Sequence, residues 1–581
     1  MVDFNTSTNY SCDVMEPSDE YYYDINYNQW YLDRIQAPFA WALTTGNPDI
    51  VIAILDTGFD WEHDDLGPGT DNYDNIYLNK AEDAWVPWND PTGCNFDDED
   101  GNGFKNDWKG WGEMHHPDSM PTYFMGNDTR NYTYEWCLIE NQYEEYDAEA
   151  DWFHGTFIAG IIGAKTNNEK GIAGIAGGWN SKGASLLFYK TGICGNMIQK
   201  YVTGICYAVV SLPGDDQARV IEMPFYSYYS DILHNAIEFA YNHGVFLVAA
   251  AGNHASGGQW NVSYPASDPY VFAVGATDHY DIRKINSNYG PDHQIDICAP
   301  GDDILSIVPQ DGHDDDGYQT IEGKTSAASA MVAGTAALML SVNPELTNLQ
   351  IAQILRDSAD KGEYYYYNEG YNEEIGYGRL NTYRSVCGAM ALAGDWEIIN
   401  DNIILDSDSS FMNSIYIKDG ATLTITADME FGPEAKLVVE QGGTLIINGG
   451  TLTNMKCCNY EFTNWPGIQV WGDRFASQYT PGAQGKLIIN GGTIENALLA
   501  VDLWKPGTTD MTGGIIEAHD AIFLNNAKSV RAIYYRNFNP VYPNQEMDYL
   551  GTFDDCSFIL DSNYLGKYLF EKHVDLAQVK G

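Results

Sequence analysis

Apolar residues gather in two kinds of run along the first two thirds of the chain. Ile50 to Leu55 and Val245 to Ala251 are short, unbroken and rich in β-branched or small side chains. Such runs are typical of strands that are buried on both faces of a parallel sheet. Ala327 to Leu340 is longer, rich in alanine and free of charged residues, which favours a buried helix. The pattern therefore predicts an α/β fold.

The pattern changes near residue 393, where helical periodicity stops and short β-type runs recur between Gly, Asn and Asp residues. Residues 443–451 and 485–493 are nearly the same sequence, GTLIINGGT and GKLIINGGT. Repeated short strands with regular turn residues favour a parallel β-solenoid, and a β-sandwich is the alternative. We therefore divide the chain into an N-terminal arm at 1–28, an α/β domain at 29–392 and a β-rich accessory domain at 393–581.

Four polar residues stand at the ends of the apolar runs. Asp56 and Asn253 follow the two predicted strands, His154 precedes an apolar helix, and Ser326 opens the Ala-rich helix. Each also has a plain structural interpretation: turn residues for Asp56 and Asn253, a structural imidazole for His154, and a helix N-cap for Ser326. Because sites in open α/β sheets lie beyond the carboxyl ends of the strands, all four are candidate catalytic residues.

Gly323-Lys324-Thr325 looks like the end of a phosphate-binding loop. That motif requires a Gly with four residues between it and the Gly-Lys pair, and here the preceding Gly317 is one residue too far away. Asp314, Asp315 and Asp316 in the same loop would repel a triphosphate. Nucleotide binding is therefore not expected.

The residues around these four positions resemble the subtilisin-like serine peptidases. The likeness spans roughly residues 29 to 388 and is carried by Ile54-Leu55-Asp56-Thr57-Gly58, His154-Gly155-Thr156, Ala250-Ala251-Gly252-Asn253, Thr325-Ser326 and Val332-Ala333-Gly334. The resemblance implies a doubly wound, mainly parallel sheet and a serine endopeptidase that acts on proteins or peptides.

The resemblance also implies a role for each residue. Ser326 would attack the peptide carbonyl, and His154 would take its proton and pass it to the leaving amine. Asp56 would hold the imidazole tautomer, and Asn253 would bind the oxyanion together with the Ser326 backbone N–H. His63 is read as structural, because the family keeps a comparable His there.

The chain departs from the family pattern close to the nucleophile. Lys324 stands where the family usually has Gly, Ala330 where it has Pro, and Met331 where it has His. No catalytic group is lost, but Lys324 adds a cation and a side chain beside the predicted active-site turn.

A larger departure affects the predicted substrate-binding residues Pro224, Phe225, Tyr226, Ala251 and Gly252. Pro224 removes a backbone donor from the strand that would pair with substrate, and Phe225 and Tyr226 add bulk where the family has small residues. The segment predicts a restricted specificity pocket. The alternative is a catalytically impaired binding or adhesion protein with a subtilisin-like body.

Calcium is the implied metal. Alternate oxygen-bearing positions and a central Gly make residues 98–104 similar to the front half of a calcium loop, with predicted ligands Asp98, Asp100, Asn102, Phe104 and Asp107. Lys109 occupies the terminal acidic position, so the loop is not a full EF-hand, and a plain acidic turn is the alternative. Residues 166–169 resemble the calcium loop of the family but are one residue longer.

The excess of acidic residues limits the classes of molecule that the protein is expected to bind. Acidic residues outnumber basic ones by 82 to 30, and the formal net charge is −52. This argues against nucleic acid and anionic membranes, which require basic patches, and it fits a salty environment or calcium sites. No apolar run looks long enough to span a membrane. The resemblance to extracellular peptidases implies a secreted or cell-surface location.

Overall fold

The computed structural model describes most of the chain. The described residues are 14–23, 28–67, 75–81, 100–104, 107–113, 125–126, 134–139, 142–147, 153–192, 197–213, 216–255, 261–291, 294–310, 317–360, 371–392, 397–411, 413–433, 435–455, 464–562, 564 and 572–577. They fall into two compact units, residues 14–386 and the chain from residue 387 on.

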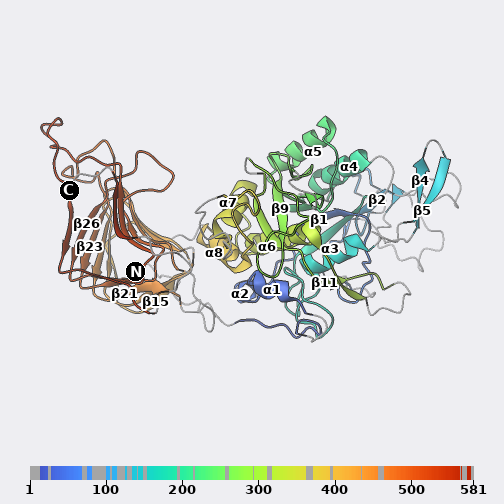
Figure 1. Cartoon of the computed structure of the whole chain (residues 1–581), viewed down its shortest axis with the longest axis horizontal. Helices are drawn as coiled ribbons and strands as arrows, with labels where there is room; N and C mark the ends of the chain where they lie inside the picture. The colour runs from blue at the N-terminus through green and yellow to red at the C-terminus, as the bar shows by residue number, and fades with distance from the viewer. Residues whose placement is uncertain are drawn as a thin grey trace. The chain divides into compact units, whose positions relative to one another are not determined.

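The first unit is built around an eight-stranded sheet that is parallel except at one edge (Figure 1). Its strand order is β10 (Ile297–Pro300), β9 (Phe272–Thr277), β8 (Phe246–Ala250), β7 (Val220–Met223), β1 (Val51–Asp56), β6 (Ser185–Lys190), β2 (Trp111–Glu113) and β3 (Met125–Gly126). Strands β10, β9, β8, β7, β1 and β6, which are neighbours in this order, are buried along their whole length. Burial on both faces explains why they read as unbroken apolar runs.

Helices cover both faces, as the prediction of a doubly wound sheet requires. Alternate residues of β1, β7 and β8 pack with α4 (Met197–Val210) and α5 (Asp231–Asn242) in one apolar cluster. The other residues of these strands face α3 (His154–Gly163) and α6 (Lys324–Val342). The remaining elements are α1 (Trp30–Arg34), α2 (Ala37–Trp41), α7 (Asn348–Ser358), α8 (Thr382–Leu392) and the antiparallel pairs β4 (Tyr134–Ile139) with β5 (Gln142–Asp147) and β11 (Ile304–Ile307) with β12 (Tyr318–Ile321).

The predicted Ala-rich helix is α6, which crosses the centre of the unit (Figure 1). It is the one helix among the described residues that is long and apolar enough to cross a membrane, and 89% of its apolar window is buried in the protein. Its small side chains allow contact with β7, β8, β9, β10 and α3 at once. These contacts are those of a core helix in a globular domain.

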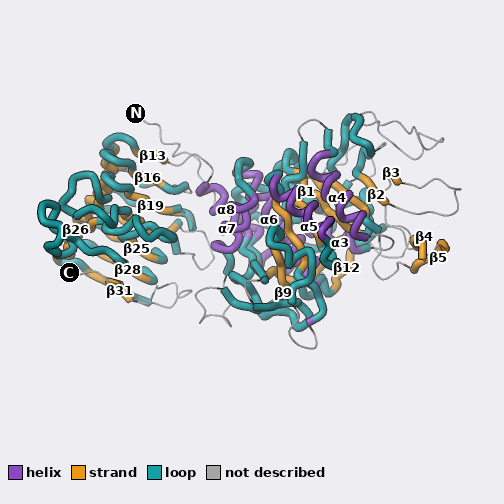
Figure 2. The backbone as a smooth tube through the Cα atoms, turned by 90° about the horizontal axis from the view of Figure 1, so that it is seen from above, coloured by secondary structure: helices purple, strands orange, loops and turns teal. Residues whose placement is uncertain are grey.

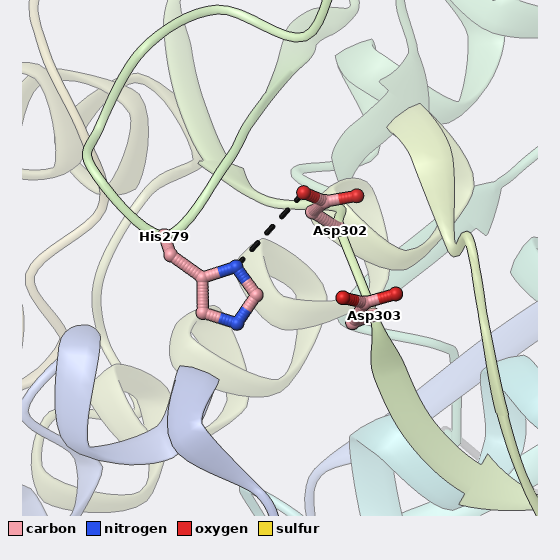
Figure 3. A group of neighbouring side chains, drawn as sticks. All are labelled: His279, Asp302 and Asp303. Carbon is pink, nitrogen blue, oxygen red and sulfur yellow. Dashed lines mark ion pairs between the residues drawn. The ribbon is translucent and has the colours of Figure 1, made fainter.

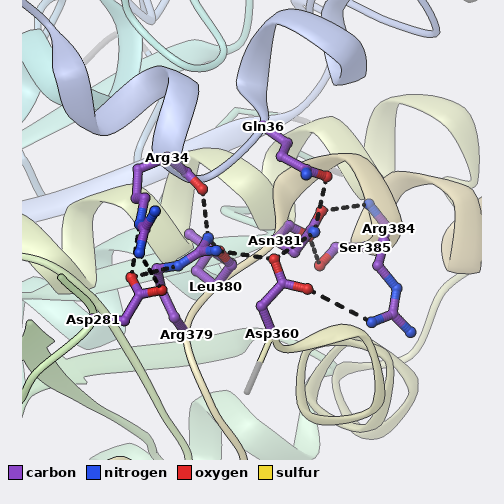
Figure 4. A network of polar contacts seen from close by, with 9 residues as sticks. All are labelled: Arg34, Gln36, Asp281, Asp360, Arg379, Leu380, Asn381, Arg384 and Ser385. Carbon is purple, nitrogen blue, oxygen red and sulfur yellow. Dashed lines mark hydrogen bonds and ion pairs between the residues drawn. The ribbon is translucent and has the colours of Figure 1, made fainter. Parts of the chain in front are cut away.

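A network of ion pairs connects α1 to Asp281 and to the segment that precedes α8 (Figure 4). Arg34 makes a bidentate ion pair with Asp281, at 2.9 and 2.6 Å. Arg379 pairs with the same Asp281 at 2.8 Å and with Asp360 at 2.9 Å. Arg379, Asp281 and Asp360 are largely buried, so each charge depends on its partners.

The second unit is a parallel β-solenoid, which confirms the favoured prediction over a sandwich (Figure 2). The first sheet stacks β13 (Glu397–Ile399), β16 (Ile415–Ile417), β19 (Lys436–Val439), β22 (Gly467–Val470), β25 (Leu499–Asp502), β28 (Lys528–Ile533) and β31 (Lys572–Ala577). The second stacks β14 (Ile403–Leu405), β17 (Thr422–Ile425), β20 (Thr444–Asn448), β23 (Lys486–Asn490), β26 (Ile515–His519) and β29 (Gly551–Asp554). The third stacks β15 (Ser409–Phe411), β18 (Met429–Phe431), β21 (Thr451–Asn454), β24 (Thr493–Glu495), β27 (Ile522–Leu524) and β30 (Ser557–Ile559).

The two near-identical sequence segments lie on successive rungs. Their strands β20 and β23 pair in register from Thr444–Lys486 to Asn448–Asn490. The two Asn side chains hydrogen-bond at 2.7 Å, and the leucines and isoleucines between them alternate into a shared core. The repeat is therefore the sequence signature of one rung stacked on the next.

Candidate active site

His154 and Asp56 form a close pair at the carboxyl end of the central strand. Asp56 is the last residue of β1, and His154 is the first residue of α3. Both carboxylate oxygens of Asp56 lie 2.9 Å from Nδ1 of His154. Asp56 is nearly buried, whereas the His154 side chain is 27% exposed. The pair fixes a proton on Nδ1 and leaves Nε2 as the basic nitrogen.

The glycine after His154 allows this approach. A Cβ atom on Gly155 would lie 2.2 Å from the carbonyl oxygen of Gly58 and 3.1 Å from the Asp56 Cβ. Any larger residue would therefore push α3 away from the end of β1.

Ser326 lies in the first turn of α6 and is 7% exposed. Its hydroxyl donates a 3.1 Å hydrogen bond to the carbonyl of Pro224, the residue that follows β7. Because Ile54 pairs with Glu222 between the parallel strands β1 and β7, Pro224 lies at the level of Asp56. The fold thus brings Ser326 to the same edge of the sheet as the Asp56–His154 pair.

A buried carboxyl group supports the turn that carries Ser326. Glu222 is fully buried, and its Oε1 accepts a 2.6 Å hydrogen bond from Ser329. The Ser326 carbonyl oxygen lies 3.0 Å from the same Ser329 hydroxyl and is the alternative acceptor for its single proton. The Oε2 atom of Glu222 has no hydrogen-bond partner. Burial, together with the nearby charge of Asp56, raises the pKa of Glu222 well above its ordinary value.

Asn253 is held by the residue next to Ser326. Its carboxamide oxygen accepts hydrogen bonds from Thr325, at 3.1 Å from the backbone N–H and 2.9 Å from the hydroxyl. The Thr325 hydroxyl in turn accepts from the Gly252 backbone at 3.3 Å. Thr325 thus fixes the carboxamide oxygen of Asn253.

Lys324 adopts a left-handed backbone conformation, with φ = 54°, immediately before Thr325. Non-glycine residues pay about 1–2 kcal/mol in this region. Glycine would adopt this conformation without the penalty. The Lys324 side chain is exposed, so the departure strains the turn without filling the site.

The predicted substrate-binding residues lie around this centre in different ways. Phe225 turns toward the body of the unit and stacks on Tyr201, with ring centroids 3.7 Å apart. Tyr226 is 62% exposed and makes an edge contact with His254. Ala251 is buried behind Gly252, which has φ = 100°. Of these two aromatic residues, Tyr226 is thus exposed and Phe225 is packed against the unit.

His63 has a structural environment. It is fully buried, its Nε2 lies 3.0 Å from the Gly317 carbonyl, and its Nδ1 accepts from the Asp65 backbone at 3.1 Å. Burial lowers the pKa of His63 to about 4. Both ring nitrogens serve the local loop.

The predicted calcium loop is only partly described, because Asp98 lies outside the described residues. Asp100 and Asp107 meet the side-chain amides of Asn79 and Asn102 at 2.8 to 3.1 Å. The Phe104 backbone donates to Asn102. In the described part of this loop, the Asp100 and Asp107 carboxylates are thus engaged by side-chain amide groups.

A second pair of acids could also hold a cation. Asp19 and Asp65 are both buried and approach the loop 166–172. Asp65 accepts from Asn168 and from the Ile172 backbone, at 2.8 and 2.9 Å, while Asp19 Oδ1 has no hydrogen-bond partner. Burial raises the pKa of Asp19 to about 6 and that of Asp65 to about 7. Among the described residues no Lys or Arg forms an ion pair with either acid, and Asp19 and Asp65 are candidate ligands for a hard cation.

Three further side chains could approach a metal ion: His279, Asp302 and Asp303, whose ligand atoms lie within 4.8 Å of one another (Figure 3). Asp302 already forms an ion pair with Lys284, and His279 stacks on Trp30 with centroids 3.7 Å apart. The ammonium group of Lys284 would repel a second cation, so these residues are not a good metal site.

Sequence reasoning gave no role to Asp19, Thr325 or Ser329. Thr325 was visible as the neighbour of the predicted nucleophile, but its contact with Asn253 depends on the fold. Asp19 lies in the predicted N-terminal arm, of which residues 14–23 pack on the unit through contacts such as Tyr21 N–H to the Gly171 carbonyl at 2.8 Å. No local sequence signal marks it as part of a site.

Comparison with known proteins gives a consistent result. The profile of the subtilase family matches residues 47–378. The chain is 30% identical over 371 residues to a thermophilic serine proteinase of Bacillus sp. (strain AK1), covering 64% of this chain and 69% of that protein. It is 29% identical over 361 residues to the halolysin-like extracellular serine protease Nep of Natrialba magadii, covering 62% and 51%. It is 31% identical over 255 residues to thermitase of Thermoactinomyces vulgaris, covering 43% and 80%.

Proposed function

This chain belongs to the subtilase family of serine endopeptidases, and from that membership we propose how it cuts a peptide bond. The nucleophile is Ser326, the general base is His154, and Asp56 orients the imidazole. The observation that carries this assignment is the Asp56–His154 contact of 2.9 Å at the sheet edge where Ser326 meets Pro224.

In the reaction, the Ser326 hydroxyl breaks its hydrogen bond to the Pro224 carbonyl. It gives its proton to Nε2 of His154 as its oxygen attacks the substrate carbonyl. Asp56 stabilises the resulting imidazolium. The Asn253 NH₂ group and the Ser326 backbone N–H take the negative charge of the tetrahedral intermediate. His154 then protonates the leaving amine, and water releases the acyl group by the reverse route.

The proposed pocket is restricted at its rim. Tyr226, together with Pro224, Phe225, Ala251 and Gly252, is assigned to substrate binding, and its large exposed ring supports the restriction. Cleavage of a random peptide library should show a narrow preference. Tyr226→Gly should widen it, and a broad preference of the unaltered enzyme for large apolar residues would contradict the restriction.

Calcium and an extracellular or cell-surface location belong to the same proposal. The buried acids Asp19 and Asp65 support a calcium site at the loop 166–172, where bound calcium would supply the missing positive charge and hold the loop. The loop with Asp98, Asp100, Asn102, Phe104 and Asp107 remains a second predicted site. A location outside the cell is supported by the name of the extracellular relative.

A fluorophosphonate probe tests the assignment directly. It should label the chain at Ser326, and Ser326→Ala should abolish both labelling and casein digestion, while Ser329→Ala keeps the label. Absence of labelling in the folded protein would favour the alternative of a non-catalytic binding protein.

A further inference from the structure

One corner of the β-solenoid is built differently along its length. Residues 418–421 and 440–443 connect the first sheet to the second in short turns. The next three rungs carry longer connections at the same corner, residues 471–485, 503–514 and 534–550. In repeat proteins, insertions that recur on one face mark that face as a binding surface.

The long connections form a fixed wall. The Tyr535 hydroxyl donates to the Ala476 carbonyl at 2.7 Å, and the Gln478 amide donates to the Gly513 carbonyl at 3.0 Å. Asn537 accepts a 3.0 Å hydrogen bond from the Gln478 backbone. All three connections are therefore tied to one another, and the surface they form is preorganised.

A groove runs between this wall and the short turns. It consists of two adjoining pockets of about 420 and 330 Å³ that share Glu440, Trp471 and Lys505. Asp419 and Gln441 line the first pocket, and Tyr416, Lys436 and Gln469 line the second. Each volume lies in the range of small-molecule sites.

The lining combines flat rings with balanced polar groups. Trp471 and Tyr416 lie edge to face, and the Trp471 indole N–H donates to the Gln469 amide at 3.1 Å. The Lys505 ammonium stands 4.2 Å above the Trp471 ring. Trp471 and Tyr416 are only 7% and 9% exposed, so a ligand reaches the face of the indole only after Lys505 has moved aside. The carboxylates Asp419 and Glu440 balance the cations Lys436 and Lys505, so the groove does not favour a charged ligand.

We propose that this groove binds a neutral oligosaccharide. Once Lys505 has moved aside, a sugar ring can present its C–H face to Tyr416 and Trp471. Its hydroxyl groups can donate to the carboxylates, accept from the ammonium groups and do both with the amides. An extended peptide fits less well, because β19 and β22 beneath the groove are paired on both sides and offer no free edge. The site lies wholly in the second unit and does not depend on the proposed hydrolytic centre.

The test uses the full chain with Ser326→Ala, which prevents self-digestion. Its binding to cello-, xylo-, manno-, malto- and chito-oligosaccharides of two to six units is measured by titration calorimetry and by tryptophan fluorescence, with polygalacturonate and a random peptide pool in parallel. We expect saturable binding of at least one neutral series and a change in fluorescence as Lys505 leaves the Trp471 ring.

Glu440→Gln should weaken that binding by at least about tenfold, and Lys505→Ala should abolish the fluorescence change that accompanies it. Glu517→Gln is the matched control. Glu517 forms an ion pair with Lys486 at 2.8 Å on another sheet, as Glu440 does with Lys418 at 2.6 Å. The Glu517→Gln variant should bind the oligosaccharide as tightly as its parent. Binding of polygalacturonate or peptide alone, no binding of any neutral series, or equal effects of Glu440→Gln and Glu517→Gln would overturn the proposal.

Discussion

The hydroxyl of Ser329 donates a 2.6 Å hydrogen bond to the buried carboxyl of Glu222, one turn along the helix from Ser326. A carboxyl group thus occupies the interior directly beneath the proposed nucleophile, with one oxygen left without a hydrogen bond. Burial raises its pKa well above the ordinary value, which favours the protonated form.

Glu222 should therefore make stability depend on pH. Its folded-state pKa is raised above the ordinary 4.5, so the folded chain holds the proton more tightly than the unfolded chain. Its contribution is fully present below pH 4.5 and is lost as pH rises toward the folded pKa. Glu222→Gln removes this slope, which amounts to up to about 1.4 kcal/mol per pH unit.

Urea unfolding of Ser326→Ala with and without Glu222→Gln, between about pH 5 and 9, measures the difference. The absolute stability can shift either way, because the Gln NH₂ group meets the same unpartnered position. Parallel stability curves over the whole range would show that Glu222 is not held protonated.

Thr325 should act on the rate through Asn253. Asn253→Ala should lower kcat about a hundred- to a thousandfold, the range known for loss of an oxyanion donor in subtilisin, with little change in KM. Thr325→Val removes only the 2.9 Å hydroxyl contact and should cost less. In the double variant the Thr325→Val effect should largely vanish, and simple additivity would contradict a positioning role.

Lys324→Gly should stabilise the first unit. Glycine removes the penalty of φ = 54°, a gain of about 1–2 kcal/mol that the greater freedom of the unfolded chain partly offsets. Lys170 is also exposed and is not left-handed, so Lys170→Gly should destabilise. Thermal unfolding of both in the Ser326→Ala background decides the sign.

Calcium removal should destabilise the first unit through Asp65. Calcium at about 100 times its Kd adds about 2.7 kcal/mol, which a chelator would withdraw. Asp65→Asn should abolish the response of Tm to chelator. Asp64→Asn, at an exposed neighbouring position, should keep it. Asp100→Asn tests the other predicted loop separately. A Tm that does not change when chelator is added would count against both proposed calcium sites.

Replacing Arg379 should lower the free energy of unfolding strongly. Arg379→Met leaves Asp360 without its main partner and weakens the Asp281 pair (Figure 4), which predicts a loss of about 3–5 kcal/mol. Arg356→Met breaks a more exposed pair with Asp296 and should cost about 1 kcal/mol or less. Equal losses in chemical denaturation would show that burial of the network is not decisive.

Local patterns predicted the elements better than the contacts between them. Strands β1 and β8 could be predicted because burial on both faces leaves an unbroken apolar run. The solenoid could be predicted because β20 and β23 repeat nearly the same sequence. The partners of Glu222 could not be read, because Ser329 lies 107 residues away. Asp19 and the saccharide groove depend on segments that only the fold brings together.

The central position of α6 affects how this enzyme loses activity on heating. Because the helix with Ser326 packs against β7, β8, β9, β10 and α3, it cannot fray without opening the whole domain. Heat inactivation and global melting should therefore coincide, with no folded but inactive species between them.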